Sequence, residues 1–153
     1  MVCYIVLQKQ THCIRSSCFE AALDKDGIAY KEYAIADTNE VQSVTTAAAG
    51  ECDVLYIPTD NTLASVTETV YNVVAPAKVP VIAGEEGICN GCGVATLSIS
   101  YYDLGYATGE MAYEILAEGA DITTMDVRYA PNVTKKYNAK ICEELGITVP
   151  DDY

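Results

Sequence analysis

The sequence predicts an α/β fold in which a mainly parallel sheet is flanked by helices. From Phe19 onward, short apolar runs alternate with longer segments of helical periodicity, and this alternation is typical of parallel sheets. The chain has 153 residues, of which 50% are hydrophobic, and this length and composition suit one folded domain. No apolar run reaches the length of about 18 residues at which a membrane-spanning helix is suspected.

Capping and turn residues divide the first half of the chain into elements. Gly27 follows Asp26 after the helical segment Phe19–Leu23 and suits a left-handed helix cap. Asp37 and Asn39 offer side chains that can cap the next helix. The expected elements are a strand over 28–36, a helix over 40–49, a strand over 52–57 and a helix over 62–74.

The second half continues the alternation. The expected elements are a strand over 79–83, a turn over 84–87, a strand over 94–99, a long helix over 102–118, a short strand over 126–129 and a last helix over 134–145. Gly146 and Pro150 end the last helix. Ligands of such folds bind outside the carboxyl ends of the strands, so the candidate ligand loops are residues 58–61, 84–87 and 98–103.

Composition excludes several classes of function. The formal net charge is −13, which disfavours binding to nucleic acid or to anionic lipid. His12 is the one histidine, so His-rich metal sites and histidine-dependent catalytic sets are not expected. The glycines near residues 84–93 do not form a phosphate-binding loop. We therefore expect no catalytic residues, no metal and no cofactor.

Polar residues follow two of the expected strands. Thr59, Asp60 and Asn61 combine a hydroxyl, a carboxylate and an amide before a helix, and such groups can hold the amino group and carboxylate of a small solute. The same triplet also suits plain helix capping. Glu85 and Glu86 follow the next strand, and we expect Glu85 to face the ligand.

Tyr102 and Asp103 open the expected long helix. A tyrosine offers an aromatic face and a hydroxyl to a solute. Asp103 can pair with an ammonium group or cap the helix. The chain has twelve tyrosines, so a tyrosine alone indicates little. Tyr102 and Asp103 are candidate ligand-binding residues because they follow an expected strand.

Cys89 and Cys92 form a C-x-x-C pair among seven cysteines. A redox pair of this kind ordinarily opens a helix, whereas here we expect glycine-rich turns and then a strand. A local disulfide or free thiols are favoured, and a small flavodoxin-like or thioredoxin-like redox enzyme using both cysteines is the alternative function. A third class, a ligand-sensing regulatory domain that binds DNA, lacks a helix-turn-helix segment and a basic patch.

Three stretches in order resemble a known family: DVLYIPTDNTL at 53–63, PVIAGEEG at 80–87 and GVATLSISYYDLG at 93–105. They resemble substrate-binding proteins of ABC transporters with the type I periplasmic-binding-protein fold, whose members include receptors for tryptophan and other aromatic amino acids. The resemblance implies two α/β lobes that close on an amino-acid-like solute and deliver it to a membrane permease. It also favours a ligand role for Thr59, Asp60 and Asn61.

The resemblance covers residues 19–153, which would form the second, C-terminal lobe of such a protein. Residues 101–126 would then pack on the first lobe, whose own sheet this sequence does not contain. The unpartnered apolar stripe of the long helix predicts self-association. The parent protein would be a lipoprotein-like extracytoplasmic receptor, membrane-anchored or periplasmic. No signal peptide is visible, so the chain as written would stay in the cytoplasm.

Residues 1–18 do not follow the family pattern. Codons that are permitted for these residues can be translated in a shifted reading frame. One such translation has the pattern of a strand, a polar loop and an amphipathic helix, and it rejoins the sequence at Glu20. We therefore expect residues 1–18 to be an out-of-frame remnant and the chain to be a truncated fragment of its parent. The nucleotide sequence tests this hypothesis, because a stop codon in the alternative frame would exclude it.

Overall fold

The computed structural model describes residues 1–7, 14–151 and 153. These residues form two compact units, one of residues 1–97 with 135–153 and the other of residues 98–134. The strands are β1 (Val2–Leu7), β2 (Tyr30–Ile35), β3 (Val54–Ile57), β4 (Val81–Ala83), β5 (Ala95–Ile99) and β6 (Val133–Tyr137). The helices are α1 (Ile14–Lys25), α2 (Val41–Glu51), α3 (Asn61–Ala64), α4 (Thr67–Ala77), α5 (Glu86–Cys92), α6 (Tyr101–Leu116) and α7 (Ala139–Leu145), with a 3₁₀ turn at Ile122–Thr124.

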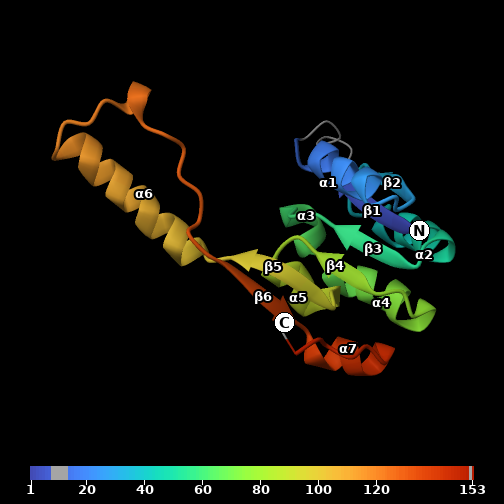
Figure 1. The fold of residues 1–153 in the computed structure, drawn as a ribbon. Coiled ribbons are helices and arrows are strands. Elements are labelled where there is room, and N and C mark those ends of the chain that lie inside the picture. Colours follow the sequence, from blue (N-terminus) through green and yellow to red (C-terminus); the bar gives the residue numbers. More distant parts are fainter. Residues whose placement is uncertain (8–13, 152) are drawn as a thin grey trace. The chain divides into compact units, whose positions relative to one another are not determined.

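The six strands form one sheet in the order β2-β1-β3-β4-β5-β6 (Figure 1). The pairs β1–β2, β1–β3, β3–β4 and β4–β5 are all parallel, so the predicted mainly parallel α/β fold is confirmed. The chain runs from β1 outward to β2 and then returns past β1 to β3. The direction of winding therefore reverses between β1 and β3, and this is where α/β sheets bind ligands.

One face of the sheet carries the main core. Side chains of a strand alternate between faces, and the in-register residues Cys3, Leu55 and Val81 are all fully buried on this face. Helices α2, α4 and α5 supply Val41, Val70 and Ile88, among others, to the same core. Each such aliphatic side chain contributes roughly 1.5–3 kcal/mol on burial.

An aromatic cluster holds α1 on the opposite face of the sheet. The Phe19 ring of α1 stacks on Tyr56 of β3 with 4.3 Å between ring centroids, and it meets Tyr4 of β1 edge-on at 5.7 Å. The Tyr4 hydroxyl also donates to carboxylates of Glu20 and Glu32. Strand β1 and the start of helix α1 thus belong to residues 1–18, the stretch that the sequence predicts to be atypical.

The prediction for residues 1–18 concerns a stretch that the structure describes only in part. Residues 8–13, which include His12 and Cys13, lie outside the described residues. The described part shows Val2–Leu7 as β1 and a helix that starts at Ile14. Gly27 adopts the predicted left-handed conformation, with a φ of 67°. The out-of-frame origin of residues 1–18 stays a prediction.

The predicted turn at 84–87 is wrong in its second half, because helix α5 begins at Glu86. The Glu85 carboxylate caps this helix by accepting from the main-chain N–H groups of Gly87 and Ile88. A capping side chain at this position outweighs the helix-weakening effect of the glycines. Consequently the C-x-x-C pair lies inside a short helix rather than in a turn.

The predicted helix over 134–145 is also wrong in its first part. Val133–Tyr137 is strand β6, and the helix begins only at Ala139. Asn138 separates the two, because its side-chain oxygen accepts from the N–H of Ile141 at 3.2 Å and so caps α7. Residues 126–129, expected as a short strand, are irregular.

Two smaller differences concern helix boundaries. The helix expected over 62–74 is split into α3 and α4 around Ser65 and Val66. Helix α2 begins at Val41 after Glu40, whose side chain makes no capping bond to it. The Asp37 carboxylate instead accepts from the N–H of Asn39 at 2.8 Å, so the predicted cap from this stretch is wrong.

Cys3 of β1 and Cys52 form a disulfide across a sequence separation of 49 residues. Both are buried, with 0% and 8% of their surface exposed. Among the other described cysteines, Cys18 is exposed and free, and Cys89, Cys92 and Cys142 are buried and free. None of the helices in the described ranges has the length and apolar character needed to cross a membrane.

Candidate functional site

The candidate site lies at the carboxyl edge of the sheet, beside the reversal between β1 and β3. Strand β3 ends at Ile57, and Pro58, Thr59, Asp60 and Asn61 follow it directly. Strand β4 is the next neighbour, and Gly84 and Glu85 follow its end at Ala83. Two of the three loops predicted to carry ligand contacts are therefore adjacent at one edge of the sheet.

Thr59 and Gly84 hold these two loops together. The Thr59 hydroxyl donates to the Gly84 main-chain oxygen at 3.0 Å, and the Gly84 N–H donates to the Ile57 oxygen at 2.7 Å. A Cβ on Gly84 would lie 2.5 Å from the Thr59 nitrogen, well inside van der Waals contact. Glycine is therefore required at position 84, because the two main chains approach closely there. In the sequence, the position of Gly84 after a strand is only a weak signal of this approach.

Asp60 is buried, with 7% of its surface exposed. Its Oδ1 accepts from the N–H of Leu63 at 2.8 Å and caps α3. Capping, one of the two predicted roles of this triplet, is thus confirmed for Asp60. Asn61 is exposed at the first position of α3, where its amide is open to solvent. The ligand role of Thr59, Asp60 and Asn61 stays a prediction.

Glu85 and Glu86 point to different partners. Both Glu85 oxygens accept main-chain N–H groups of the first turn of α5. The Glu86 carboxylate instead pairs with Lys136 of β6 at 2.6 Å. The two carboxylates therefore do not form an acid/base pair. Glu85 shapes the loop after β4, whereas its contact with a ligand stays a prediction.

Tyr102 and Asp103 belong to the second unit and lie in the first turn of α6. The side chain that caps this helix is Ser100, which accepts from the Asp103 N–H at 3.1 Å. The suggested capping role of Asp103 is therefore wrong, although its charge still favours the helix N-terminus. The Tyr102 side chain is 80% exposed and so open to a partner or ligand.

Helix α6 buries none of its residues, all of which the structure describes. The exposed apolar side chains include Tyr106, Tyr113 and Leu116, with 62%, 62% and 85% of their surface exposed. A single guanidinium nitrogen of Arg128, Nη2, donates to both Glu114 carboxylate oxygens, at 2.7 and 2.6 Å. The predicted unpartnered apolar surface is therefore present in this unit.

Cys89 and Cys92 face the core from α5. Each is 1% exposed, and burial raises the pKa of Cys89 to about 11 and that of Cys92 to about 12. Thiolates are the reactive form of cysteine, so these thiols are poorly suited to redox chemistry at neutral pH. Of the two states expected for this pair, a local disulfide or free thiols, the structure shows free thiols.

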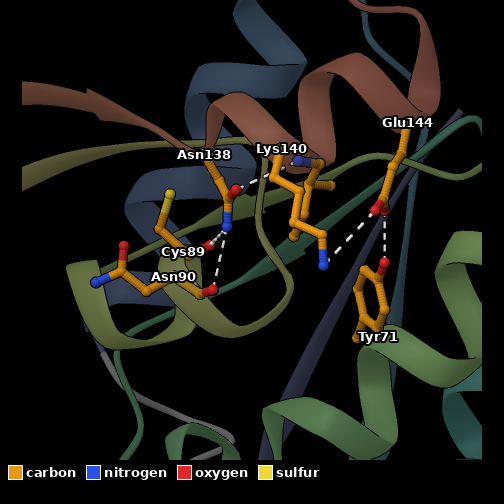
Figure 2. A network of polar contacts seen from close by, with 7 residues as sticks. Tyr71, Cys89, Asn90, Asn138, Lys140 and Glu144 are labelled. Carbon is orange, nitrogen blue, oxygen red and sulfur yellow. Dashed lines mark hydrogen bonds and ion pairs between the residues drawn. The ribbon is translucent and has the colours of Figure 1, made fainter.

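Helix α7 is fixed to α5 and α4 by polar contacts (Figure 2). The Asn138 amide donates to the main-chain oxygens of Cys89 and Asn90 at 3.3 and 3.1 Å. The Tyr71 hydroxyl donates to Glu144, which also pairs with Lys140 at 3.7 Å. Asn138 was missed as a structural residue, although an asparagine before an amphipathic segment is typical of a helix cap.

Residues 9–153 match the family model described as ABC transporter substrate binding protein. The chain belongs to this family. The match begins at residue 9, whereas the resemblance expected from the sequence begins at Phe19. Members of this family bind solutes and are not enzymes, so the expectation that the chain is not an enzyme is confirmed.

Several characterised proteins are similar to the chain. A tyrosine-binding protein of Clostridioides difficile is 39% identical over 100 residues, which are 62% of this chain and 29% of that protein. An ABC domain in complex with L-Trp from Streptococcus pneumonia has a TM-score of 0.86 and 29% identity. A ligand-free, open substrate-binding protein with adhesive properties from Clostridium difficile has a TM-score of 0.76 and 31% identity.

The matches cover nearly all of this chain but only part of each solved structure. Each match takes in 99% of this chain and 51% of the solved chain. The chain therefore spans about half the length of the substrate-binding proteins it resembles. The shared half contains the parallel sheet and the two edge loops after β3 and β4.

Proposed function

We propose that this chain is the second lobe of a substrate-binding protein that captures an aromatic or other amino-acid-like solute for an ABC importer. The main support for this proposal is the pair of loops joined by Thr59 and Gly84 at the carboxyl edge of the sheet. Such an edge is where α/β sheets bind ligands, and the family is one of substrate-binding proteins.

The chemistry of the edge suits a zwitterionic solute. Asp60 offers a carboxylate that caps α3 through Oδ1, and Asn61 exposes an amide with donor and acceptor atoms. Tyr102 belongs to the second unit, and its ligand role is a separate proposal that rests on its exposed aromatic ring. Relatives that bind tyrosine and L-Trp support this choice of solute class.

A membrane permease is the proposed partner of the full-length parent, which we place outside the cytoplasm. The match to the family of ABC transporter substrate-binding proteins is the ground for this location. A lipid anchor and the out-of-frame origin of residues 1–18 are further parts of the proposal, to be tested on the parent gene.

The chain alone is proposed to bind weakly or not at all, because about half of the matched proteins has no counterpart in it. The exposed apolar side chains of α6 are proposed to make the isolated chain self-associate. Light scattering tests this directly, and a monodisperse monomer at high concentration would contradict self-association.

Thermal unfolding with a panel of amino acids tests the function. The panel contains tyrosine, tryptophan, leucine and aspartate, offered to this chain and to a full-length parent with the upstream half restored. A ligand at 100 times its Kd stabilises the native state by about 2.7 kcal/mol. We expect tyrosine or tryptophan to raise the Tm of the parent and not that of the chain. A parent that ignores the whole panel would refute the proposed solute class.

A further inference from the structure

One face of helix α6 is a continuous exposed stripe. Positions that alternate in spacing between four and three residues lie on one face of a helix. The α6 stripe with this spacing consists of Tyr102, Tyr106, Gly109, Tyr113 and Leu116. Its tyrosine and leucine side chains are between 62% and 85% exposed. A Cβ on Gly109 would meet nothing within 4 Å, so a partner can approach the middle of the helix closely.

The sheet of the first unit also has an exposed apolar area. Tyr56, Ile82 and Ala95 are in register and therefore share one face of the sheet. The Phe19 ring of α1 stacks on Tyr56 on that face. Leu97 follows Ala95 by two residues and so points to the same face. Ile82 and Leu97 are 38% and 59% exposed, so this face is covered by α1 at Tyr56 and open at β4 and β5.

Strand β6, at the end of the sheet opposite to β2 (Figure 1), extends this open area. The Lys136 ammonium pairs with Glu86 of α5, on the core face, so Lys135 and Tyr137 lie on the opposite face. Tyr137 is 47% exposed. The Lys135 ammonium lies 5.5 Å from the ring centroid of Tyr153. The β4–β6 strip is defined by the exposed residues Ile82, Leu97 and Tyr137, and it has a positive charge at its β6 side.

Ser100 alone separates the end of β5 at Ile99 from the start of α6 at Tyr101. The helix that follows a strand of a parallel sheet normally returns to pack on that sheet, and the β4–β6 strip is the area beside α1 that such a helix would cover. Helices of α/β units are usually joined to the preceding strand by about two to six residues. A link of one residue is shorter than this range, which favours a covering helix from another chain.

We propose that two copies of this chain exchange α6, so that the α6 stripe of each copy covers the β4–β6 strip of the other. The proposal rests on the self-association proposed above and names the two surfaces that produce it. A reciprocal, two-fold exchange closes the assembly, because both copies use the same two surfaces on each other. The exchange requires no solute, so dimerisation and amino-acid binding stand or fail separately.

The exposed area is sufficient for a stable dimer. An aromatic side chain buries roughly 150–250 Å², so the exposed parts of Tyr102, Tyr106 and Tyr113 in two copies supply on the order of 800 Å². The two β4–β6 strips that receive them bury a similar area. The total is then roughly 1,600 Å², which is the standard size of a specific protein interface.

The charges beside the two surfaces are opposite in sign. Helix α6 contains no lysine or arginine, and Glu110 and Glu118 line a hollow with Gly109 on the α6 stripe. Lys135 lies on the face of the β4–β6 strip. Complementary charges orient the partners of an interface, whereas like charges disfavour it. The β4–β6 strip is therefore favoured as the covering surface over a second α6 stripe, which would bring carboxylates together.

Sedimentation equilibrium of the full chain and of three exposed-site variants tests the exchange. Tyr113→Asp places a charge on the α6 stripe and Leu97→Asp places one on the β4–β6 strip. Tyr129→Asp is the control, because Tyr129 is 82% exposed and belongs to neither surface. We expect wild type and Tyr129→Asp to be dimers at micromolar concentration, and each of the other two variants to raise the dimer Kd at least about tenfold. A monomeric wild type, or dimerisation of Leu97→Asp at the wild-type Kd, would overturn the proposal.

A mixture of Tyr113→Asp and Leu97→Asp separates the exchange from the pairing of two α6 helices. Each variant keeps the surface that the other lacks, so the mixture can form one of the two contacts intact. We expect a heterodimer that is tighter than the dimer of either variant alone, and no gain in the mixture would refute the exchange. Circular dichroism checks that each variant is folded, and Tyr113→Ser with Leu97→Ser replaces an aspartate variant that is not.

Discussion

The Thr59 hydroxyl donates a hydrogen bond to the main-chain oxygen of Gly84, with 3.0 Å between the two oxygens. This bond joins the loop after β3 to the loop after β4. Because both loops follow neighbouring parallel strands, they form one continuous surface at the carboxyl edge. A change in either loop should therefore alter the position of the other.

Gly84→Ala is expected to destabilise the fold. The added Cβ would lie 2.5 Å from the Thr59 nitrogen and 2.9 Å from the Pro58 carbonyl carbon, and main-chain atoms cannot move aside as a side chain can. Overpacking of this kind costs about 1–3 kcal/mol. Urea denaturation measures the loss as a lower midpoint at an unchanged slope.

The matched control for this substitution is Gly50→Ala. Gly50 is exposed near the end of α2, and a Cβ there meets nothing within 4 Å. Alanine is favoured over glycine in a helix by up to about 1 kcal/mol, so we expect the opposite sign. Equal effects of the two substitutions would show that the close approach at Gly84 is unimportant.

Glu85→Ala and Glu86→Ala should differ although the residues are adjacent. Glu85 accepts the two main-chain N–H groups that open α5, and loss of such a cap costs about 0.5–2 kcal/mol. Glu86 forms an exposed ion pair with Lys136, and such pairs contribute about 0–1 kcal/mol. Thermal unfolding of both variants should therefore show the larger drop in Tm for Glu85→Ala. A larger drop for Glu86→Ala would contradict the capping role.

Much of the sheet was predictable because its strands are continuous apolar runs. Residues 52–57 and 79–83 are of this kind, and each contains an observed strand, β3 and β4. Turn residues after those strands located the edge loops as well. The sequence could also indicate Asp60 as a helix cap, because an aspartate before a helical segment is a local signal.

The failures arose where tertiary contacts decide the local structure. Strand β6 includes Lys135 and Lys136 and most of it is exposed, so it lacks the apolar pattern of a strand. It becomes one because it lies beside β5 in the sheet. Helix α5 contains two glycines, and its start depends on the Glu85 side chain folding back onto the main chain. The close approach at Gly84 likewise depends on Thr59, which is distant in sequence.

Alkaline pH should destabilise the fold through its buried thiols. Burial raises the pKa of Cys92 from 9.0 to about 12 and that of Cys89 to about 11, so the native state holds these protons more tightly than the unfolded state. Their contribution to stability is complete below pH 9 and is lost as the pH rises toward 11–12. Urea midpoints measured between pH 8 and about 10.5 should fall, and Cys92→Ala should reduce that fall. An unchanged pH dependence in Cys92→Ala would show that this thiol titrates normally.

Asn138→Ala should loosen the attachment of α7 to the rest of its unit. The substitution removes two bonds donated to the Cys89 and Asn90 oxygens and one accepted from the Ile141 N–H. Loss of the cap alone costs about 0.5–2 kcal/mol, and each other bond contributes about 0.5–1.5 kcal/mol. We expect faster amide exchange in residues 139–145 together with a lower Tm.

Tyr71→Phe is the matched control for the same helix, because it removes only the exposed hydroxyl contact with Glu144. Its ring still packs beside Ile141 and Cys142, so the apolar part of the α4–α7 contact is kept. We therefore expect a change below about 1 kcal/mol and little change in exchange over α7, because an exposed hydrogen bond has a small net effect. If Tyr71→Phe released α7 as strongly as Asn138→Ala, the attachment would depend on the α4 contact rather than on the Asn138 bonds to α5.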